Sequence, residues 1–477
     1  MKTVREFIEN YANIAHAVIR RGAFDLLFKS IFDDRGTSCG IVYCHPAAIY
    51  SDAENTEAYY DDLFSLSKIY REQIEPVKGR VVVVSSSLGP GGSERQISNT
   101  LVGLRRKGID IHYLGVWLDA APDNRFHVAR VAEHDVPVHA LERRETVRLQ
   151  GVLVTPTEIG GLLEHLPEHA LDIILNLVME FRELKPETIH AWLDEKNIFC
   201  GIAAVICGVP NIILSCRSVA PTNFPFHRNY MRPAYRALLR QRNVHLLNNS
   251  KAGAQSYSTW LEYDRSKIKI IRNAVEFRTT EFPSARSPGL LKALGISEEA
   301  PVVGSIFRLG AEKRPMLWLD TARWVLDRKP DCQFILIGDG PMREEMISYA
   351  TELGLVENLH MLGVRDDIDI VVTAMDAFLL TSEIEGLPNV LMEAQYLGVP
   401  VVAPSVGGVP EAVNHGRSGF LCDESTPGSL GALLVGILED SNFKSSVKSE
   451  GPEFVEREFS MEKMLSESIS VYRAGVS

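Results

Sequence analysis

The sequence has few cysteines, and their arrangement argues against two kinds of cross-linked fold. Seven occur in 477 residues, at positions 39, 44, 200, 207, 216, 332 and 422, and no two of them have Cys-x-x-Cys spacing. An odd, widely scattered set is not typical of a disulfide framework or of a structural zinc site. The pattern predicts reduced thiols and a cytoplasmic protein.

Positive charge is also scarce. The 50 Lys and Arg residues are outnumbered by 62 Asp and Glu residues, which gives a net charge of −12. General nucleic-acid binding needs a basic surface, so the balance argues against that class. The 45% hydrophobic and 23% charged residues are ordinary values for a globular protein and exclude global disorder.

Long apolar runs are nearly absent. The start, Met1 to Glu6, lacks the apolar core of a signal peptide. One uncharged stretch, Asn197 to Cys216, is long enough to suggest a membrane span. It is interrupted by Gly208-Val209-Pro210, which favours a helix, a turn and a buried strand over a span. We therefore expect a soluble or peripheral protein.

The length predicts two domains, because one hydrophobic core stops growing at about 250–300 residues. Residues 1–78 have a mostly helical pattern, with an amphipathic stretch from Tyr11 to Phe32. This part is interpreted as a helical extension packed on the next domain, the alternative being a helix on a membrane surface.

From Gly79 onward, strands alternate with helices. The β-branched run Val81–Val84 predicts a strand buried on both faces, and helix and strand patterns follow at 93–107 and 111–116. A Pro- and Gly-containing stretch from about 284 to 299 resembles a linker, and a strand pattern restarts at 302–306. We predict two doubly wound parallel-sheet α/β domains, 79–283 and 284–457, with a last helix at 458–477 that returns to the first domain.

Ligands of such sheets bind beyond the carboxyl ends of the strands, so two facing sheets predict a site in the crevice between the domains. One candidate is the loop Leu88-Gly-Pro-Gly-Gly-Ser-Glu-Arg95, where Gly91 and Gly92 precede a helix that could bind an anion. A tight turn explains the glycines equally well. The loop is not Gly-x-Gly-x-x-Gly, and no acidic residue ends the next strand, which argues against a dinucleotide.

Two further loops carry charge directly after predicted strands. Arg308 and Lys313 lie five residues apart, an arrangement that suits a diphosphate, although surface loop cations are commonly just solvated. Glu385 and Glu393 lie eight residues apart across a loop and a helix start, where acidic residues are also favoured by the helix dipole. The loop Gly407-Gly408-Val409-Pro410-Glu411 closes the same sheet end.

Together these stretches resemble the retaining glycosyltransferases of family 4 in the GT-B superfamily, of the bacterial polysaccharide and glycolipid type. The resemblance covers about residues 81–475 and is strongest from Val302 to Phe420. It rests on GSIFRLGAEKRP, FILIGDGPMREEM, EIEGLPNVLMEAQYLGVPVVA and GGVPEAVNHGRSGFL, with GPGGSERQ, IHAW, CGIAAVICGVP and Asn273 in IRNAVEF from the first half.

The resemblance implies a GT-B fold and a transfer of a hexose-type sugar, with retention, from a nucleotide sugar (UDP-sugar above others) to a glycan or lipid-linked acceptor. Arg308 and Lys313 would hold the diphosphate, and Glu385 would lie near the transferred sugar. Glu393 would bind the ribose. The remaining implied contacts are Gly91, Gly92, Asn389 and Val390 at the diphosphate, and Gly363, Val364 and Arg365 at the base.

The resemblance also implies that neither a metal nor another cofactor is required. The cations and a helix N-terminus would neutralise the charge that a metal ion otherwise neutralises. The leaving phosphate would accept the acceptor's proton, so no enzymic nucleophile is expected.

One departure from the family pattern concerns the acceptor side. Many relatives have a second histidine where His190-Ala191-Trp192 has Trp192. His190 is a candidate catalytic residue lining the cleft, although a lone histidine at a strand end is commonly structural. Asp194 is a further possibility.

Four arginines, Arg228, Arg232, Arg236 and Arg240, recur every fourth residue and would line one helix face. They indicate either a solvated surface or docking to anionic lipid at the inner face of the membrane, or to a phosphorylated acceptor. Among functions, a sugar-nucleotide epimerase, a phosphorylase and a non-catalytic sugar-nucleotide-binding module stay as alternatives to the transferase. The sequence leaves the nucleotide, the sugar, the acceptor and the oligomeric state open.

Overall fold

A computed structural model describes residues 57–61, 63–65, 74–142, 168–276 and 288–474. Both sheets described below belong to one compact unit that spans Tyr60–Ser477. Most of the predicted helical extension, including the amphipathic stretch from 11 to 32, lies outside the described residues. So do Cys39 and Cys44.

The first sheet has seven strands in the order β3-β2-β1-β4-β5-β6-β7, and every pairing is parallel. Val81 pairs with Ile111 on one side and with Thr188 on the other. The four valines of β1 are buried because helices cover both faces. The strands are β1 (Val81–Ser85), β2 (Ile111–Gly115), β3 (Val138–Ala140), β4 (Thr188–Trp192), β5 (Asn211–Cys216), β6 (Val244–Asn248) and β7 (Lys269–Ile270).

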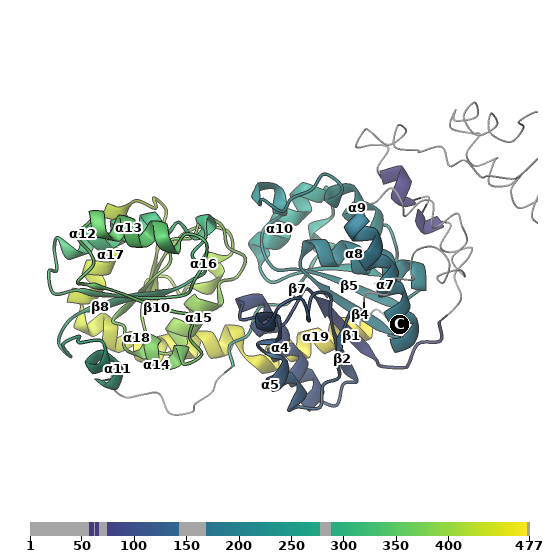
Figure 1. The fold of residues 1–477 in the computed structure, drawn as a ribbon, viewed down its shortest axis with the longest axis horizontal. Helices are drawn as coiled ribbons and strands as arrows, with labels where there is room; N and C mark the ends of the chain where they lie inside the picture. The colour runs from purple at the N-terminus through teal and green to yellow at the C-terminus, as the bar shows by residue number, and fades with distance from the viewer. Residues whose placement is uncertain (1–56, 62, 66–73, 143–167, 277–287, 475–477) are drawn as a thin grey trace, which may run out of the picture. The chain divides into compact units, whose positions relative to one another are not determined.

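Two layers of helices enclose this sheet. Figure 1 shows α7 to α10 on one face, and α4, α5 and the last helix, α19, on the other. The helices of this half are α4 (Gly92–Arg106), α5 (Val128–Ala132), α7 (Glu168–Leu184), α8 (Asp194–Cys207), α9 (Met231–Leu238) and α10 (Lys251–Leu261). Short 3-10 turns are η2 (Pro122–Arg125), η4 (Pro221–Asn223) and η5 (Arg265–Lys267).

The uncharged stretch from Asn197 to Cys216 is divided between α8 and β5. Gly208 ends α8 with φ +69°, a left-handed conformation that glycine adopts without strain. No helix within the described ranges is long and apolar enough to cross a membrane.

The second sheet has six parallel strands in the order β10-β9-β8-β11-β12-β13. Neighbouring residues of one strand enter different apolar clusters: Val303 packs with Trp318 on one face, and Val302 packs with Leu391 on the other. The strands are β8 (Val302–Ile306), β9 (Gln333–Ile337), β10 (Leu359–Gly363), β11 (Ala377–Leu379), β12 (Val401–Pro404) and β13 (Gly419–Cys422).

Helices again cover both faces, with α12, α13 and α17 on one side of the sheet and α11, α14, α15 and α18 on the other (Figure 1). The predicted linker is only partly irregular, because residues 288–293 form α11 and Leu291 is buried against Val302. These elements are α11 (Pro288–Ala293), η6 (Ala311–Lys313), α12 (Pro315–Leu326), α13 (Arg343–Glu352), α14 (Ile368–Thr373), α15 (Asn389–Tyr396), α16 (Val409–Ala412), α17 (Pro427–Glu439) and α18 (Ser441–Phe459).

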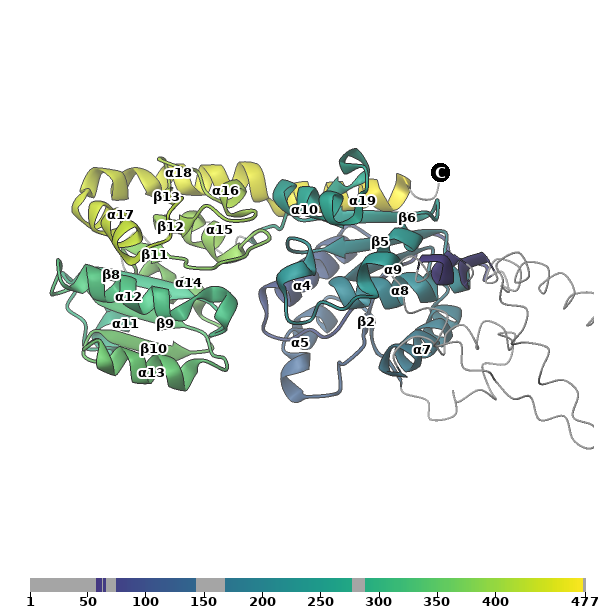
Figure 2. The same ribbon diagram turned by 90° about the horizontal axis from the view of Figure 1, so that it is seen from above.

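The end of the chain connects the two halves. After α18, the helix α19 (Met461–Ala474) lies along the first half, as Figure 2 shows. Its Leu465 and Tyr472 belong to the same apolar cluster as Val81 and Ile97. A Cβ at Gly103 of α4 would lie 2.7 Å from Leu465, so glycine allows the two helices to approach closely.

Each sheet has one point where the strand order reverses direction: between β1 and β4 in the first, and between β8 and β11 in the second. Loops leave such a point in opposite directions and open a crevice beyond the carboxyl ends of the strands. Both predicted charged loops follow the reversal strands of the second sheet, and the glycine loop follows β1 of the first.

Candidate functional site

A cavity of about 580 Å³ lies where loops from both sheets meet. Its walls combine loops after β1, β5 and β7 with loops after β8, β10 and β11. Nine of the predicted site residues line it: Gly91, Gly92, Arg308, Lys313, Val364, Arg365, Glu385, Asn389 and Val390. His190 and Glu393 lie in two other, smaller cavities.

The cation loop after β8 is fastened to the carboxylate loop after β11. Lys313 Nζ lies 2.5 Å from Glu385 Oε1, and both side chains are mostly buried. Arg314 reinforces this contact: it has a left-handed φ of +48° and its guanidinium donates to the Thr381 carbonyl at 2.7 Å. Arg308 is exposed on the cavity wall. These two loops therefore offer the cavity one exposed guanidinium, that of Arg308, and one ammonium already held by a carboxylate.

Two helices begin at the cavity. α4 begins at Gly92 and α15 at Asn389, and the Asn389 amide donates to the Gly92 carbonyl at 2.9 Å. Neither helix has a side-chain N-cap, so backbone N–H groups at both starts lack that internal acceptor. Such groups are suited to an anion, and two helix starts side by side suit a diphosphate.

Glycines around Glu385 are required by close backbone approaches. A Cβ at Gly407, which has φ +50°, would lie 2.0 Å from the Glu385 carbonyl oxygen, and one at Gly408 would lie 1.8 Å from the Gly386 carbonyl oxygen. A Cβ at Gly386 would in turn lie 2.2 Å from the Arg217 carbonyl oxygen, across the boundary between the halves. Adding a side chain at these positions would displace the loop that carries Glu385.

The cavity rim beyond β10 has one uncovered apolar side chain. Val364 is 59% exposed, beside Arg365. The Arg365 guanidinium is bound to Asp367 at 2.5 Å, and this contact raises the pKa of Arg365 and lowers that of Asp367. A flat ring lying on Val364 would be flanked by a fixed ion pair.

Glu393 lies one helical turn beyond Asn389 and lines an adjoining cavity of about 50 Å³. Its Oε1 is 2.6 Å from Arg95 of α4, which lines both cavities. Its Oε2 is buried and has no hydrogen-bond partner within the described part of the chain. This oxygen can accept a hydrogen bond from a ligand.

His190 is placed differently from the expectation that it lines the cleft. It is buried, and its Nδ1 lies 2.9 Å from the hydroxyl of Tyr472, which comes from α19. Burial lowers the pKa of His190 to about 3, with a smaller contribution from Arg217. It lies between the sheet and α19, where its Nε2 is buried without a hydrogen-bond partner among the described residues, and its catalytic role stays a prediction.

The further candidate Asp194 is not among the residues that line the large cavity. It is enclosed by Tyr235 and Tyr257, whose hydroxyls donate to its carboxylate. Burial raises the pKa of Asp194 despite these hydrogen bonds.

Sequence reasoning missed two residues at this site. Arg217 directly follows β5 and lines the large cavity, and Arg95 bridges to Glu393. Arg217 could have been predicted from its position at the carboxyl end of a buried strand, because ligands of parallel sheets bind there. Arg95 belongs to the glycine-loop motif GPGGSERQ. Its partner Glu393 lies 298 positions later, so this ion pair could not be predicted from local spacing.

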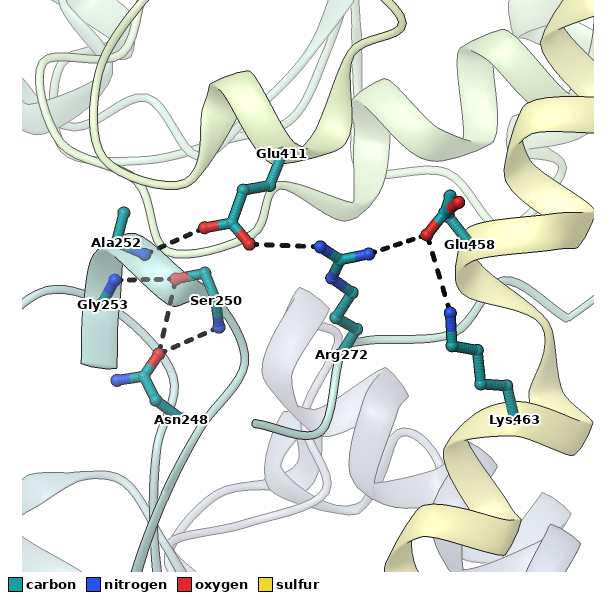
Figure 3. A network of polar contacts seen from close by, with 8 residues as sticks. All are labelled: Asn248, Ser250, Ala252, Gly253, Arg272, Glu411, Glu458 and Lys463. Carbon is teal, nitrogen blue, oxygen red and sulfur yellow. Dashed lines mark hydrogen bonds and ion pairs between the residues drawn. The ribbon is translucent and has the colours of Figure 1, made fainter. Parts of the chain in front are cut away.

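Outside the cavity, ion pairs tie the halves together. Figure 3 shows Arg272, which follows β7, between Glu411 of α16 at 3.5 Å and Glu458 of α18 at 2.9 Å. The other oxygen of Glu411 accepts from the Ala252 N–H at 2.9 Å, at the start of α10. Lys463 of α19 lies 3.6 Å from Glu458.

The four arginines predicted on one helix face do not form one. α9 spans only Met231–Leu238, so Arg228 and Arg240 lie outside it. Arg232 and Arg236 both pair with Glu262, and Arg240 pairs with Asp61. Because internal carboxylates bind three of them, they do not present an unopposed basic surface.

Comparison with known proteins gives these residues a context. Residues 289–454 match the family model described as glycosyl transferases group 1. The Vi polysaccharide biosynthesis protein VipC/TviE of Salmonella typhi is 31% identical over 364 residues, which is 73% of this chain and 63% of that protein. The chain thus spans less than two thirds of that relative's length.

A second relative is the UDP-Gal:alpha-D-GlcNAc-diphosphoundecaprenol alpha-1,3-galactosyltransferase of Escherichia coli. It is 27% identical over 278 residues, covering 56% of this chain and 70% of the relative. Among solved structures, HepE of Anabaena in complex with UDP and glucose superposes with a TM-score of 0.68 at 20% identity, over 83% of this chain and 99% of that one. At this identity the likeness concerns the fold, which is GT-B as predicted.

Proposed function

We propose, from the premise that this chain belongs to the group 1 glycosyl transferases through residues 289–454, that it transfers a hexose-type sugar from a nucleotide sugar to a glycan or lipid-linked acceptor with retention of anomeric configuration. One observation carries the proposal. A single cavity brings together Arg308, Lys313 and Glu385 from the second sheet with the start of α4 from the first. This combination suits a diphosphate joined to a sugar.

The diphosphate would lie against Arg308, Lys313 and the N-termini of α4 and α15. Their charges would stabilise the negative charge that develops on the departing nucleotide. Glu385 orients Lys313 through their 2.5 Å contact, and its carboxylate also borders the space for the sugar. The acceptor hydroxyl would attack from the side of the leaving phosphate, which would take its proton.

The nucleoside would extend toward the rim. Val364 offers an apolar surface for a base, and the unpartnered Oε2 of Glu393 suits a ribose hydroxyl. For Glu393 to be reached, the ligand must extend past Arg95, which separates the two cavities. UDP is the nucleotide we favour, since two of the compared proteins are described with UDP or a UDP-sugar.

The acceptor and the location are part of the proposal. The Escherichia coli relative is named for a diphosphoundecaprenol-linked substrate, which supports a lipid-linked acceptor here. Cys200, Cys207, Cys216, Cys332 and Cys422 are free and buried, in keeping with a reducing cytoplasm. Contact with the inner face of the membrane through Arg228 remains in the proposal, because Arg228 is bound only by carbonyl oxygens and no ion pair of it is found within the described ranges.

The proposal is tested by ligand-induced stabilisation of the full chain with UDP, GDP, ADP and their glucose conjugates. A ligand at 100 times its dissociation constant adds about 2.7 kcal/mol to the free energy of unfolding. The anomeric configuration of the product, read by NMR coupling constants, tests retention. Failure of every nucleotide to stabilise the protein would contradict a nucleotide-sugar site.

We also propose that the reaction needs no metal ion or other cofactor, because Arg308, Lys313 and two helix starts supply positive charge at the diphosphate. A chelator such as EDTA should then leave the transfer rate almost unchanged. Complete loss of activity that magnesium or manganese restores would contradict this.

A further inference from the structure

Arg217 is a cavity residue to which the proposed function assigns no task. It follows β5 at the carboxyl end of the first sheet, and it borders both the large cavity and the small one that contains His190. Its backbone carbonyl contacts the loop of the second half at Gly386, so it lies beside Glu385 rather than at the rim.

Neutral groups hold the Arg217 guanidinium in place. Its centre lies 3.9 Å from the centroid of the Trp192 ring, which it covers. One terminal nitrogen donates to Ser215 Oγ at 3.3 Å, and the other donates to Asn273 Oδ1. The Asn273 amide nitrogen is itself used, donating to the Leu387 carbonyl at 3.0 Å and to Asn389 Oδ1 at 2.7 Å, so its oxygen must face Arg217.

This cation lacks a counter-ion within the part of the chain that the structure describes. No carboxylate there forms an ion pair with it, and burial raises the pKa of the adjacent Cys216 thiol well above its usual value, so that thiol is neutral. Burial lowers the pKa of Arg217 to about 9, which still leaves the guanidinium charged at neutral pH. Arg217 is only partly buried and lines the cavity, so an anion bound there can pair with this charge.

Two terminal N–H groups of five are used by Ser215 and Asn273. A guanidinium is a rigid, planar fork that binds a carboxylate through two parallel hydrogen bonds. The diphosphate already has Arg308, Lys313 and two helix starts, all grouped at the loops of α4, β8 and β11. A neutral hexose beside them would leave the charge of Arg217 without a partner.

We propose that Arg217 binds a carboxylate of an acidic sugar, carried either by the sugar being transferred or by the acceptor. The inference rests on the proposed function and names its substrate class: a uronic-acid-type sugar on one side of the reaction. Trp192 and Asn273 act as positioning residues, since they fix the plane and the direction of the guanidinium.

The test compares binding of UDP, UDP-glucose and UDP-glucuronate to the full chain, by calorimetry, in wild type, Arg217→Gln and Arg217→Lys. Wild type should bind UDP-glucuronate about tenfold or more tightly than UDP-glucose, the effect of a charge-assisted hydrogen bond. Arg217→Gln should lose that preference and still bind UDP within about twofold of wild type. Arg217→Lys should keep only part of the preference, because an ammonium lacks the planar fork.

A second arm tests the acceptor as the source. Methyl glucuronide and methyl glucoside are titrated into the protein saturated with UDP. Binding of the glucuronide alone, abolished by Arg217→Gln, would support the proposal with the carboxylate on the acceptor. Thermal unfolding of Arg217→Gln is the folding control, because a variant that unfolds cooperatively shows that a change in binding does not come from loss of the fold.

Two results would overturn the inference. One is the absence of any Arg217-dependent preference for a carboxylate in both arms. The other is a loss of UDP affinity in Arg217→Gln as large as that in Arg308→Gln, which would make Arg217 a third diphosphate ligand. The proposed function itself fails only if none of UDP, GDP and ADP binds wild type, so the two failures are distinguishable.

Discussion

The two sheets share a strand order around their reversal points, and yet their loops differ in charge. The second sheet places Arg308, Lys313 and Glu385 at its carboxyl edge, with two of the three joined in an ion pair. The first places a glycine helix start and a single arginine held by neutral side chains. Topology thus determines where a ligand is bound, and the loops determine which charges it meets.

A closer contrast is between Lys313 and Arg217. Lys313 has its carboxylate partner within the chain, whereas no carboxylate pairs with Arg217 among the described residues. The first cation is balanced before a ligand arrives, and the second is not. This difference leads us to assign the diphosphate to Arg308, Lys313 and the two helix starts, and a further anionic group to Arg217.

The largest expected effect comes from removing the cations of the second half. Replacing Arg308 or Lys313 by alanine should lower turnover by about two to three orders of magnitude, the usual cost of one lost charge-stabilising donor. Lys313→Ala should be the more damaging, since it also leaves Glu385 without its partner. Turnover is measured as release of the nucleotide. Lys329→Ala, which breaks a peripheral pair with Glu439, is the matched control.

Near wild-type turnover of both Arg308→Ala and Lys313→Ala at saturating donor would mean that these two cations do not stabilise the departing nucleotide. The comparison between the halves would then rest on Arg217 alone.

The contact between the halves is tested by Gly386→Ala. The added Cβ would lie 2.2 Å from the Arg217 carbonyl oxygen, so the loop carrying Glu385 must move away from the first half. Overpacking of this kind costs about 1–3 kcal/mol. We expect kcat/KM to fall by about 10- to 100-fold, because the groups that the two halves contribute to the reaction are no longer correctly positioned relative to each other.

Gly436→Ala is the control for that substitution. Gly436 lies inside α17, and a Cβ there would meet nothing within 4 Å. Alanine should leave activity unchanged and stabilise the helix by up to about 1 kcal/mol. Equal kinetics of the two glycine variants would argue against a tight contact at Gly386.

The first half should respond to acid through His190. An unfolded histidine titrates near 6.5, whereas the folded pKa of His190 is about 3. Between these values the unfolded chain holds more protons, so the free energy of unfolding falls as the pH falls. From pH 6.5 to pH 5, the loss due to this group is about 2 kcal/mol.

Urea unfolding at both pH values checks this effect. His190→Gln should lose about 2 kcal/mol less than wild type over the interval. An unchanged acid dependence in His190→Gln would mean that His190 is not held neutral by burial.

The smallest effect concerns the membrane. Arg228 is the member of the arginine set without an ion pair in the described ranges, and each basic residue near anionic lipid contributes about 1 kcal/mol. Arg228→Glu should weaken co-flotation with phosphatidylserine vesicles by about fivefold or more at low salt, and added salt should reduce the difference. Identical flotation of Arg228→Glu and wild type at low salt would mean that Arg228 is solvated and does not contact lipid. Lys329→Ala again serves as the control.

Much of the fold was predictable because parallel sheets have a strong local signature. The valine run of β1, the helix predicted at 93–107 and the restart at Val302 agree with the structure to within about two residues. The errors have local causes too. Pro288 and Gly289 suggested a linker, but they begin α11, whose Leu291 is buried in the core. The arginine spacing suggested a long helix, but α9 spans only Met231–Leu238.

By itself, the sequence determined which residues follow each strand, because the order of strands and loops is written along the chain. That was enough to group Arg308, Lys313, Glu385 and Asn389 at one sheet edge. Only the tertiary structure decided their partners: Glu385 for Lys313, Tyr472 for His190, and neutral side chains alone for Arg217. Charge compensation and burial depend on groups that are distant in sequence, so local spacing does not reveal that burial lowers the pKa of His190 or that Arg217 is held by neutral side chains.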